Sequence, residues 1–259
     1  MKPRLSSLRR VEALDYTRRC GKSVGMETVL FFGLALADVA LLVWGIALAN
    51  RHGWMTSANL VLLTLFGLFY DNLLLALGRF IGAGALLETL SYGRFVLHAL
   101  LTPLLVVWAW HATRRAGMPW ARRERARTGV IGVTLALIAF ELVTQVAGLN
   151  LDAELHQGVV KYSDAVPTQG PPLMAVIVAA TIIASGVVLW RRLRWPWLLA
   201  GSVLLVVGSI VSALSAQDVV TNIFEFVLLL SIMATKAHQD AHRAEPARPQ
   251  GAPLLERCR

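Results

Sequence analysis

Four acidic residues interrupt the long apolar stretches of this chain: Asp38, Asp71, Glu141 and Glu225. An ionisable side chain at membrane depth is unfavourable by about 2.5–3.5 kcal/mol on insertion scales, and it usually faces the protein interior and finds a polar partner there. His98 lies in another apolar stretch, separate from the four that contain these acids. Carboxylates and an imidazole around one cavity could exchange protons with a substrate or bind a cation. The candidate catalytic residues are therefore Asp71, His98, Glu141 and Glu225.

Further polar residues lie close to these acids in the sequence. Tyr70 and Asn72 flank the first acid of the candidate set, and Arg79 and Arg94 each stand in a Gly-Arg-Phe tripeptide on either side of the next connection. The planar guanidinium group can hold a phosphate or carboxylate by paired hydrogen bonds. We therefore expect Tyr70, Asn72, Arg79 and Arg94 to contribute to substrate binding.

Each of these residues also has a simpler interpretation. An arginine near a helix end often extends its charge to the membrane surface while its stem stays among apolar groups. His98 could be a hydrogen-bonded packing residue, and Asp38 could be protonated and bonded to a neighbouring helix. His238 and His242 have the spacing of metal ligands on a helix, but they follow the last apolar stretch among charged residues. We interpret these two histidines as part of a solvated tail.

Seven apolar stretches have the length of a membrane span. A transmembrane helix needs about 20 apolar residues to cross about 30 Å of hydrocarbon. The mean hydropathy is +0.59, and 16% of the residues are charged, against about 25% in soluble domains. The sequence thus predicts an all-α polytopic membrane protein, a bundle of about seven transmembrane helices. The stretches are roughly 28–50, 57–80, 95–112, 129–148, 172–190, 195–215 and 219–235.

The chain divides into a membrane domain and two tails. Residues 28–236 form the predicted seven-helix domain, 1–27 a basic N-terminal tail, and 237–259 a charged, proline-containing tail that we expect to be disordered. Seven Lys and Arg residues in the first tail oppose its export. That conflict disappears if the protein starts at Met26; the alternative is a cytoplasmic N-terminus with a different number of helices.

The distribution of positive charge predicts the orientation in the membrane. Fifteen Lys and Arg residues fall on the side shared by the C-terminus and the first, third and fifth connections, against three in the second, fourth and sixth connections. Cytoplasmic connections carry the excess of positive charge. We therefore expect an integral protein of a bacterial cytoplasmic membrane, with its N-terminus outside. At about 1.5 Å per residue, Asp71, His98, Glu141 and Glu225 then all lie in the outer half.

Several local features predict how the helices are built. The stretch 81–91 is too short to span, so we expect a surface-lying or re-entrant turn there. Pro103 should kink the third helix, with Thr102 satisfying the freed backbone groups. Small residues in the fifth and sixth helices should allow close helix packing. The seventh helix aligns three polar residues on one face: Asp218, Asn222 and Glu225.

Composition also bears on the partners. The net charge of +9 comes from Lys and Arg in tails, connections and helix ends, which is ordinary for a membrane protein. We therefore expect membrane lipids as partners and no nucleic acid. Cys20 and Cys258 lie in opposite tails, so neither a disulfide framework nor a zinc cluster is expected. The residue pattern does not specify a metal, a cofactor or an oligomeric state.

Two families share the expected number of helices. The chain resembles microbial rhodopsins in helix count and orientation, but retinal requires a lysine within the seventh helix. The lysines here are Lys2, Lys22, Lys161 and Lys236, and none is expected in the middle of a span. The resemblance to membrane hydrolases of the alkaline ceramidase and adiponectin-receptor type is limited to helix count, because their zinc-binding histidines have no counterpart. We assign neither family.

Three functions remain open on this basis. The leading hypothesis is an outward-facing polar pocket for a lipid or amphiphile, which could be the site of a lipid-modifying enzyme. A proton- or cation-coupled transporter would use the same carboxylates and would need an aqueous route to both sides. In a non-catalytic membrane scaffold, the acids would only join helices.

Overall fold

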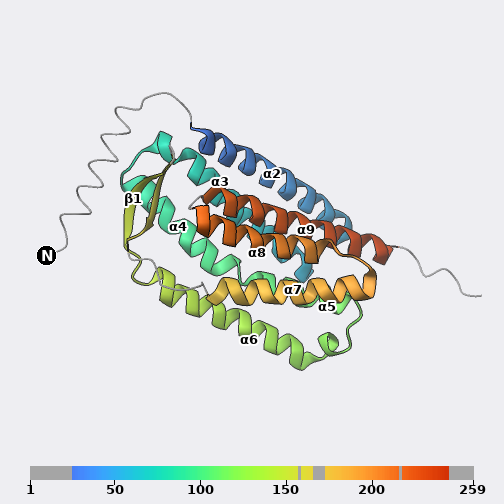
Figure 1. Cartoon of the computed structure of the whole chain (residues 1–259). Helices are drawn as coiled ribbons and strands as arrows, with labels where there is room; N and C mark the ends of the chain where they lie inside the picture. The colour runs from blue at the N-terminus through green and yellow to red at the C-terminus, as the bar shows by residue number, and fades with distance from the viewer. Residues whose placement is uncertain (1–24, 157–158, 166–172, 216–217, 245–259) are drawn as a thin grey trace, which may run out of the picture.

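The computed structural model describes residues 25–156, 159–165, 173–215 and 218–244. Within these ranges, eight α-helices run roughly along one axis (Figure 1). A π-helical segment, Leu142–Val146, extends α6, and α4 with α5 forms one long span. The helices are α2 (Met26–His52), α3 (Leu60–Ile81), α4 (Ala85–Leu101), α5 (Leu104–Arg115), α6 (Glu124–Glu141), α7 (Leu173–Leu193), α8 (Trp197–Ser215) and α9 (Asp218–Ala244).

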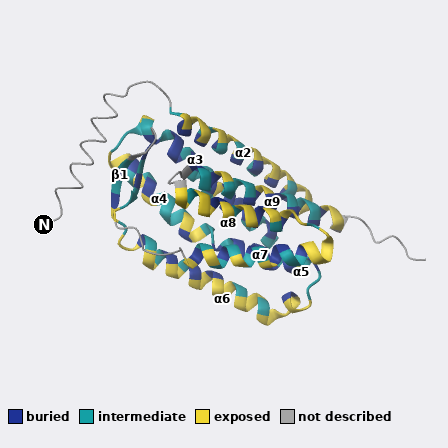
Figure 2. Cartoon of the chain, viewed as in Figure 1, coloured by how far each residue is buried: buried dark blue, intermediate teal, exposed yellow. Residues whose placement is uncertain are grey.

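Seven helical spans in the described residues are long and apolar enough to cross a membrane. Large apolar side chains are exposed on the outer faces of the bundle, among them Leu36 on α2, Leu135 on α6 and Ile210 on α8. Figure 2 shows yellow, exposed stretches along these three helices. Such surfaces are stable against lipid and unfavourable in water. The protein is a multi-pass, all-α membrane protein, as the sequence predicts.

The third span is longer than expected. Helix α3 ends at Ile81, the chain turns at Gly82 with a φ of 77°, and α4 begins at Ala85. Residues 85–91 are therefore the first turns of a span that runs to Arg115, and the expected surface or re-entrant turn is wrong. The reason is that no helix-breaking residue follows until Pro103.

Pro103 interrupts this span as expected, although a different residue compensates. Helix α4 ends at Leu101 and α5 begins at Leu104. The hydroxyl of Thr64 on α3 donates a hydrogen bond to the carbonyl of Leu101 at 3.2 Å. The Thr102 hydroxyl instead lies 3.4 Å from Nδ1 of His98. A neighbouring helix thus stabilises the break, which fixes α4 against α3.

A β-hairpin covers one end of the bundle, which we call the hairpin end (Figure 1). Strands β1 (Leu151–His156) and β2 (Val159–Asp164) pair antiparallel, with Leu151 opposite Asp164. Tyr162 is buried in an apolar cluster with side chains of α3 and α4. Gly78 of α3 lies against the Val160 carbonyl, where a Cβ would collide. The hydropathy pattern predicts only a connection between residues 148 and 172, so the hairpin is a finding of the structure.

Small residues bring α7, α8 and α9 together, as predicted. Gly186 of α7 lies against the backbone of Leu199 on α8, where a Cβ would come within 2.8 Å of the Leu199 Cα. On α8, Gly201 packs against Ser231 and Gly208 against Phe224, both on α9. These close approaches hold α9 in the bundle, where it also packs on α2 and α3.

Helix α9 extends beyond the expected domain boundary at residue 236. Lys236 is 2% exposed, and His238 and His242 lie on the same helix. These two histidines therefore lie on a helix and not in a tail, because the charged residues continue the helix instead of ending it; His242 is exposed, as expected for a solvated residue. The remaining parts of both expected tails, 1–24 and 245–259, and the question of a start at Met26 lie outside the described residues.

Candidate functional site

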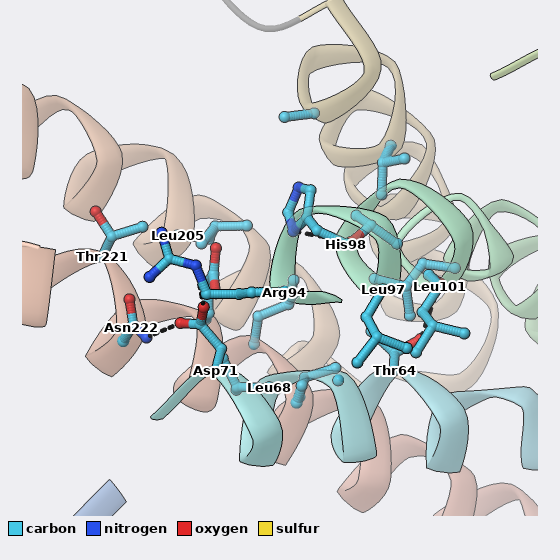
Figure 3. A pocket seen from close by; sticks show the side chains of 18 of the residues that line it. Thr64, Leu68, Asp71, Arg94, Leu97, His98, Leu101, Leu205, Thr221 and Asn222 are labelled. Carbon is cyan, nitrogen blue, oxygen red and sulfur yellow. Dashed lines mark hydrogen bonds and ion pairs between the residues drawn. The ribbon is translucent and has the colours of Figure 1, made fainter. Parts of the chain in front are cut away.

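A cavity of about 410 Å³ lies among α3, α4, α5, α7, α8 and α9. This volume falls within the range of about 300–1,000 Å³ that small-molecule sites occupy. Polar side chains gather on part of its wall (Figure 3). They include three predicted catalytic residues and one predicted binding residue. The charged and hydrogen-bonding residues of this part are Asp71, Arg94, His98, Lys161, Thr221, Asn222 and Glu225.

The rest of the wall is predominantly apolar and continues away from the hairpin end. On α3, Leu68 and Asp71 are three residues apart and both line the cavity, so the same face of the helix carries an apolar and a charged side chain. On α9, Glu225 precedes Leu228 and Leu229 in the same way. The cavity is therefore polar toward one end and apolar toward the other. Apolar lining residues from the facing helices are Leu97, Leu101, Leu105, Val178, Ile182 and Leu205.

An ion pair forms the centre of the polar part. Nε of Arg94 lies 3.2 Å from Oδ1 of Asp71, and the two side chains are 18% and 24% exposed. Nδ2 of Asn222 donates to the other carboxylate oxygen of Asp71 at 2.7 Å. Figure 3 shows Arg94 and Asn222 on either side of Asp71, from three different helices. Asp71 thus joins α3 to α4 and α9.

A chain of amides continues from this ion pair into the core. Nδ2 of Asn222 also donates to Oδ1 of Asn72 at 2.8 Å, and Nδ2 of Asn72 donates to Oδ2 of Asp38 at 2.7 Å. Asn72 and Asp38 are fully buried. Asp38 is hydrogen-bonded to a neighbouring helix, as the simpler interpretation expected. This part of the network therefore connects helices and does not face the cavity.

Three side chains of the cavity wall keep unused bonding capacity. Within the described residues, no hydrogen bond to the terminal nitrogens of Arg94 is found, and no hydrogen bond or ion pair engages the Glu225 carboxylate. His98 contacts Thr102 through Nδ1, which leaves Nε2 available. These groups can donate to, accept from or exchange a proton with a molecule in the cavity.

Other predicted site residues lie elsewhere. Glu141 is buried on α6, which packs against α4 and α5, and it does not line this cavity. The Tyr70 hydroxyl donates to the Leu90 carbonyl at 2.9 Å, and the guanidinium of Arg79 lies 6.0 Å from the Phe80 ring. Successive helix residues point about 100° apart, so Tyr70 and Asn72 face away from the cavity that Asp71 lines. The side chain of Asp218 lies outside the described residues.

Sequence reasoning missed Lys161 and Thr221. Thr221 precedes Asn222 on the polar face of α9, so the stripe itself could have indicated it. Lys161 belongs to β2, and only the hairpin brings it to the cavity. No sequence signal specific to the hairpin was recognised.

Comparisons of the sequence with models of known protein families and with curated proteins found no match. Among the described residues, no group of three or more His, Cys, Asp and Glu side chains could hold a metal ion. Arg94 and Lys161 can bind anionic or carbonyl oxygens, while Glu225 and His98 can transfer protons.

Proposed function

We propose that the cavity binds a lipid or another amphiphile, with the polar head near Arg94 and the apolar chain along the leucine-rich wall. The division of one cavity into a charged part and an apolar part is the observation that supports this function most strongly. A purely aqueous solute would leave the apolar wall unsatisfied. A purely apolar ligand would leave the terminal nitrogens of Arg94 and the carboxylate of Glu225 without hydrogen bonds, which is unfavourable in a desolvated site.

The charges on the wall indicate what kind of head group fits. Arg94 and Lys161 balance Asp71 and Glu225 in formal charge. The terminal nitrogens of Arg94 can donate to phosphate, carboxylate or ester oxygens while its Nε stays with Asp71. A head group that carries oxygen acceptors and also hydroxyl or amine donors would satisfy both signs of charge.

We further propose that the cavity faces the outside of a bacterial cytoplasmic membrane. The connections at the hairpin end carry few positive charges, whereas arginines crowd the opposite end of α5 and α7. Cysteines introduced at Arg123 and Ala165, in a Cys20→Ser/Cys258→Ser background, test this orientation. An impermeant thiol reagent on intact cells should label position 165 only, whereas labelling of position 123 only would reverse it.

Proton-transfer catalysis on the bound lipid is the second candidate function. Glu225 and His98 line the same cavity, and neither is bound to another carboxylate or to an arginine among the described residues. Together they have the residue types of a general acid–base pair. Glu225→Gln should then stop turnover of the lipid that co-purifies with the protein while binding persists.

The transporter and scaffold hypotheses have less support. On the side of the cavity away from the hairpin end, Ile232 and Met233 of α9 are fully buried. They belong to the same apolar cluster as Leu65 of α3. This layer separates the cavity from the far end of the bundle, whereas a transporter needs access to both sides. A scaffold has no use for a cavity whose polar groups keep free bonding capacity.

Lipids that co-purify with the protein provide the test. The full chain is extracted with its surrounding lipid, exchanged into detergent, and analysed by mass spectrometry for retained lipids. We expect one lipid class to be retained by the wild type and to fall at least about tenfold in Arg94→Gln, because a charge-assisted bond to the head group is lost.

Arg79→Gln is the matched control. It removes the same charge near the same membrane surface, but Arg79 does not line the cavity. Equal loss of the lipid in both variants would contradict the proposal, as would retention of the same lipid profile in Arg94→Gln. Thermal melts of all three proteins show whether any loss follows from unfolding.

A further inference from the structure

A second cavity lies at the other end of the bundle, which we call the basic end. Its volume is about 630 Å³, and it lies between the ends of α5, α7 and α9 and the segment before α6. Its lining is strongly basic and contains no acidic residue among those described. The lining residues are His111, Arg114, Arg115, Arg122, Leu193, His238, Gln239 and His242.

Two arginines of this wall have no acidic partner among the described residues. Arg114 lies over the ring of Trp110 at 5.7 Å, and the Trp110 N–H donates to the carbonyl of Ala121 at 3.0 Å. That bond fixes the segment carrying Arg122 next to α5. Arg114 and Arg122 are exposed, and the nearby acid Glu124 is paired with Arg127 at 3.3 Å. Both arginines therefore lie at the cavity without an acidic partner among the described residues.

The remaining polar groups are oriented by the protein itself. Arg115 is fixed by Asp240 at 2.7 Å and by the Gln239 carbonyl at 2.8 Å. The His238 ring stacks on Trp195 with centroids 4.0 Å apart. Nδ1 of His242 donates to the His238 carbonyl at 2.8 Å, which leaves its Nε2 facing outward from this bond. Donors with fixed directions lose little freedom when an anion binds.

We propose that this second cavity binds a phosphate group, with Arg114 and Arg122 as the charged contacts. Guanidinium groups match phosphate geometry and can each make two parallel hydrogen bonds. Positive charge on the cytoplasmic side is general among membrane proteins and does not require a cavity. Here the basic residues line a cavity, Arg114 lies over the Trp110 ring, and the His238 ring stacks on Trp195. The phosphate can belong to a lipid head group of the adjacent leaflet or to a soluble compound, and the chemistry of recognition is the same.

Two binding measurements on the full-length protein distinguish these sources. In detergent, calorimetry with inorganic phosphate, against chloride at matched ionic strength, tests a soluble ligand. In phosphatidylcholine nanodiscs containing a small fraction of phosphatidic acid, mass spectrometry of the lipid retained after detergent exchange tests a lipid ligand. We expect binding in at least one arm, and at least about tenfold weaker binding in that arm for Arg114→Gln/Arg122→Gln.

The control is Arg123→Gln/Arg125→Gln, which removes two positive charges from the same end without altering the cavity wall or the pair between Glu124 and Arg127. It should change binding by less than about twofold in the presence of salt, because salt screens solvent-exposed charges that make no direct contact with the ligand. Equal weakening in both double variants would overturn the proposal in favour of diffuse attraction. Absence of binding by the folded wild type in both arms would also overturn it. Melting temperatures establish folding in each case.

Discussion

Helix α9 carries a buried charged cluster at the basic end and a polar cavity wall at the hairpin end, and the two differ in how their charges are satisfied. At the basic end, Asp240 accepts from Arg115 at 2.7 Å and from Lys236 at 2.8 Å, and all three side chains are less than 10% exposed. At the hairpin end, Asp71 is more exposed, and its partner Arg94 keeps free terminal nitrogens.

This difference separates structural charges from charges available to a ligand. Both oxygens of Asp240 are engaged, so its carboxylate has no acceptor left for a substrate, although its partner Arg115 lines the second cavity. The cavity at the hairpin end has Glu225 and His98 without ionic partners among the described residues. A buried ion cluster is retained for the arrangement it fixes, whereas incompletely used groups on a cavity wall indicate binding or chemistry.

The largest expected effect is on stability, from Asp240→Asn. Asparagine carries no charge, so Lys236 and Arg115 stay buried without the carboxylate that they share. Breaking a buried ion pair in this way destabilises the protein by about 3–5 kcal/mol. We expect a clearly lower melting temperature in detergent. The control Glu124→Gln breaks the exposed pair with Arg127 and should have an effect below about 1 kcal/mol. Similar melts for both variants would remove the contrast between the two ends.

The second prediction concerns Asp71→Asn. The amide preserves shape and most hydrogen bonds but not the charge that holds Arg94, so the protein should fold while lipid retention falls at least about tenfold. Interhelical hydrogen bonds average only about 0.6 kcal/mol in double-mutant cycles, so the melt should change little. Glu141→Gln is the matched control, because Glu141 is buried outside this cavity. Equal loss of lipid in Glu141→Gln would contradict this assignment, because Glu141 does not line the cavity.

A smaller effect is expected from filling the apolar part of the cavity with Ala179→Phe. Ala179 lines this part on α7, and a larger side chain there should shorten the space for an apolar chain. We expect retention of long-chain lipids to fall several-fold while shorter chains are retained. Ala184→Phe is the control, because Ala184 lies on the same helix and does not line the cavity. An unchanged distribution of chain lengths in Ala179→Phe would argue that the chain lies elsewhere.

The sequence was sufficient for the spans because hydrophobic length is a local property. It also placed Asp71, His98 and Glu225 at one depth, and the structure brings all three to one cavity. Depth alone misplaced Glu141, since rotation about the helix axis and the choice of neighbouring helix depend on packing. The last apolar stretch ends at residue 235, and hydropathy does not report the pairing of Lys236 with Asp240 or of Asp240 with Arg115, because these pairs depend on helix packing.

Non-local structure explains the other differences. The β-hairpin is stabilised by contacts with α3 and α4, and its short polar and apolar alternation gives a weak signal by itself. The hydrogen bond from Thr64 of α3 to the Leu101 carbonyl is also non-local. It satisfies a backbone group freed at the break before Pro103, and no pattern near Pro103 in the sequence predicts it. Contacts between distant segments therefore decide which of the polar residues face the cavity.

The central claim, that an amphiphile occupies the cavity with its chain along the apolar wall, is tested most directly by a photoactivatable lipid. A phospholipid with a diazirine near the end of its acyl chain is added to the purified protein, crosslinked and mapped by mass spectrometry. We predict adducts on Leu101, Ile182 or Leu205, lost when excess unlabelled lipid is added and reduced in Arg94→Gln. Adducts confined to outward-facing residues such as Leu204 and Ile210, unaffected by competition, would contradict the account.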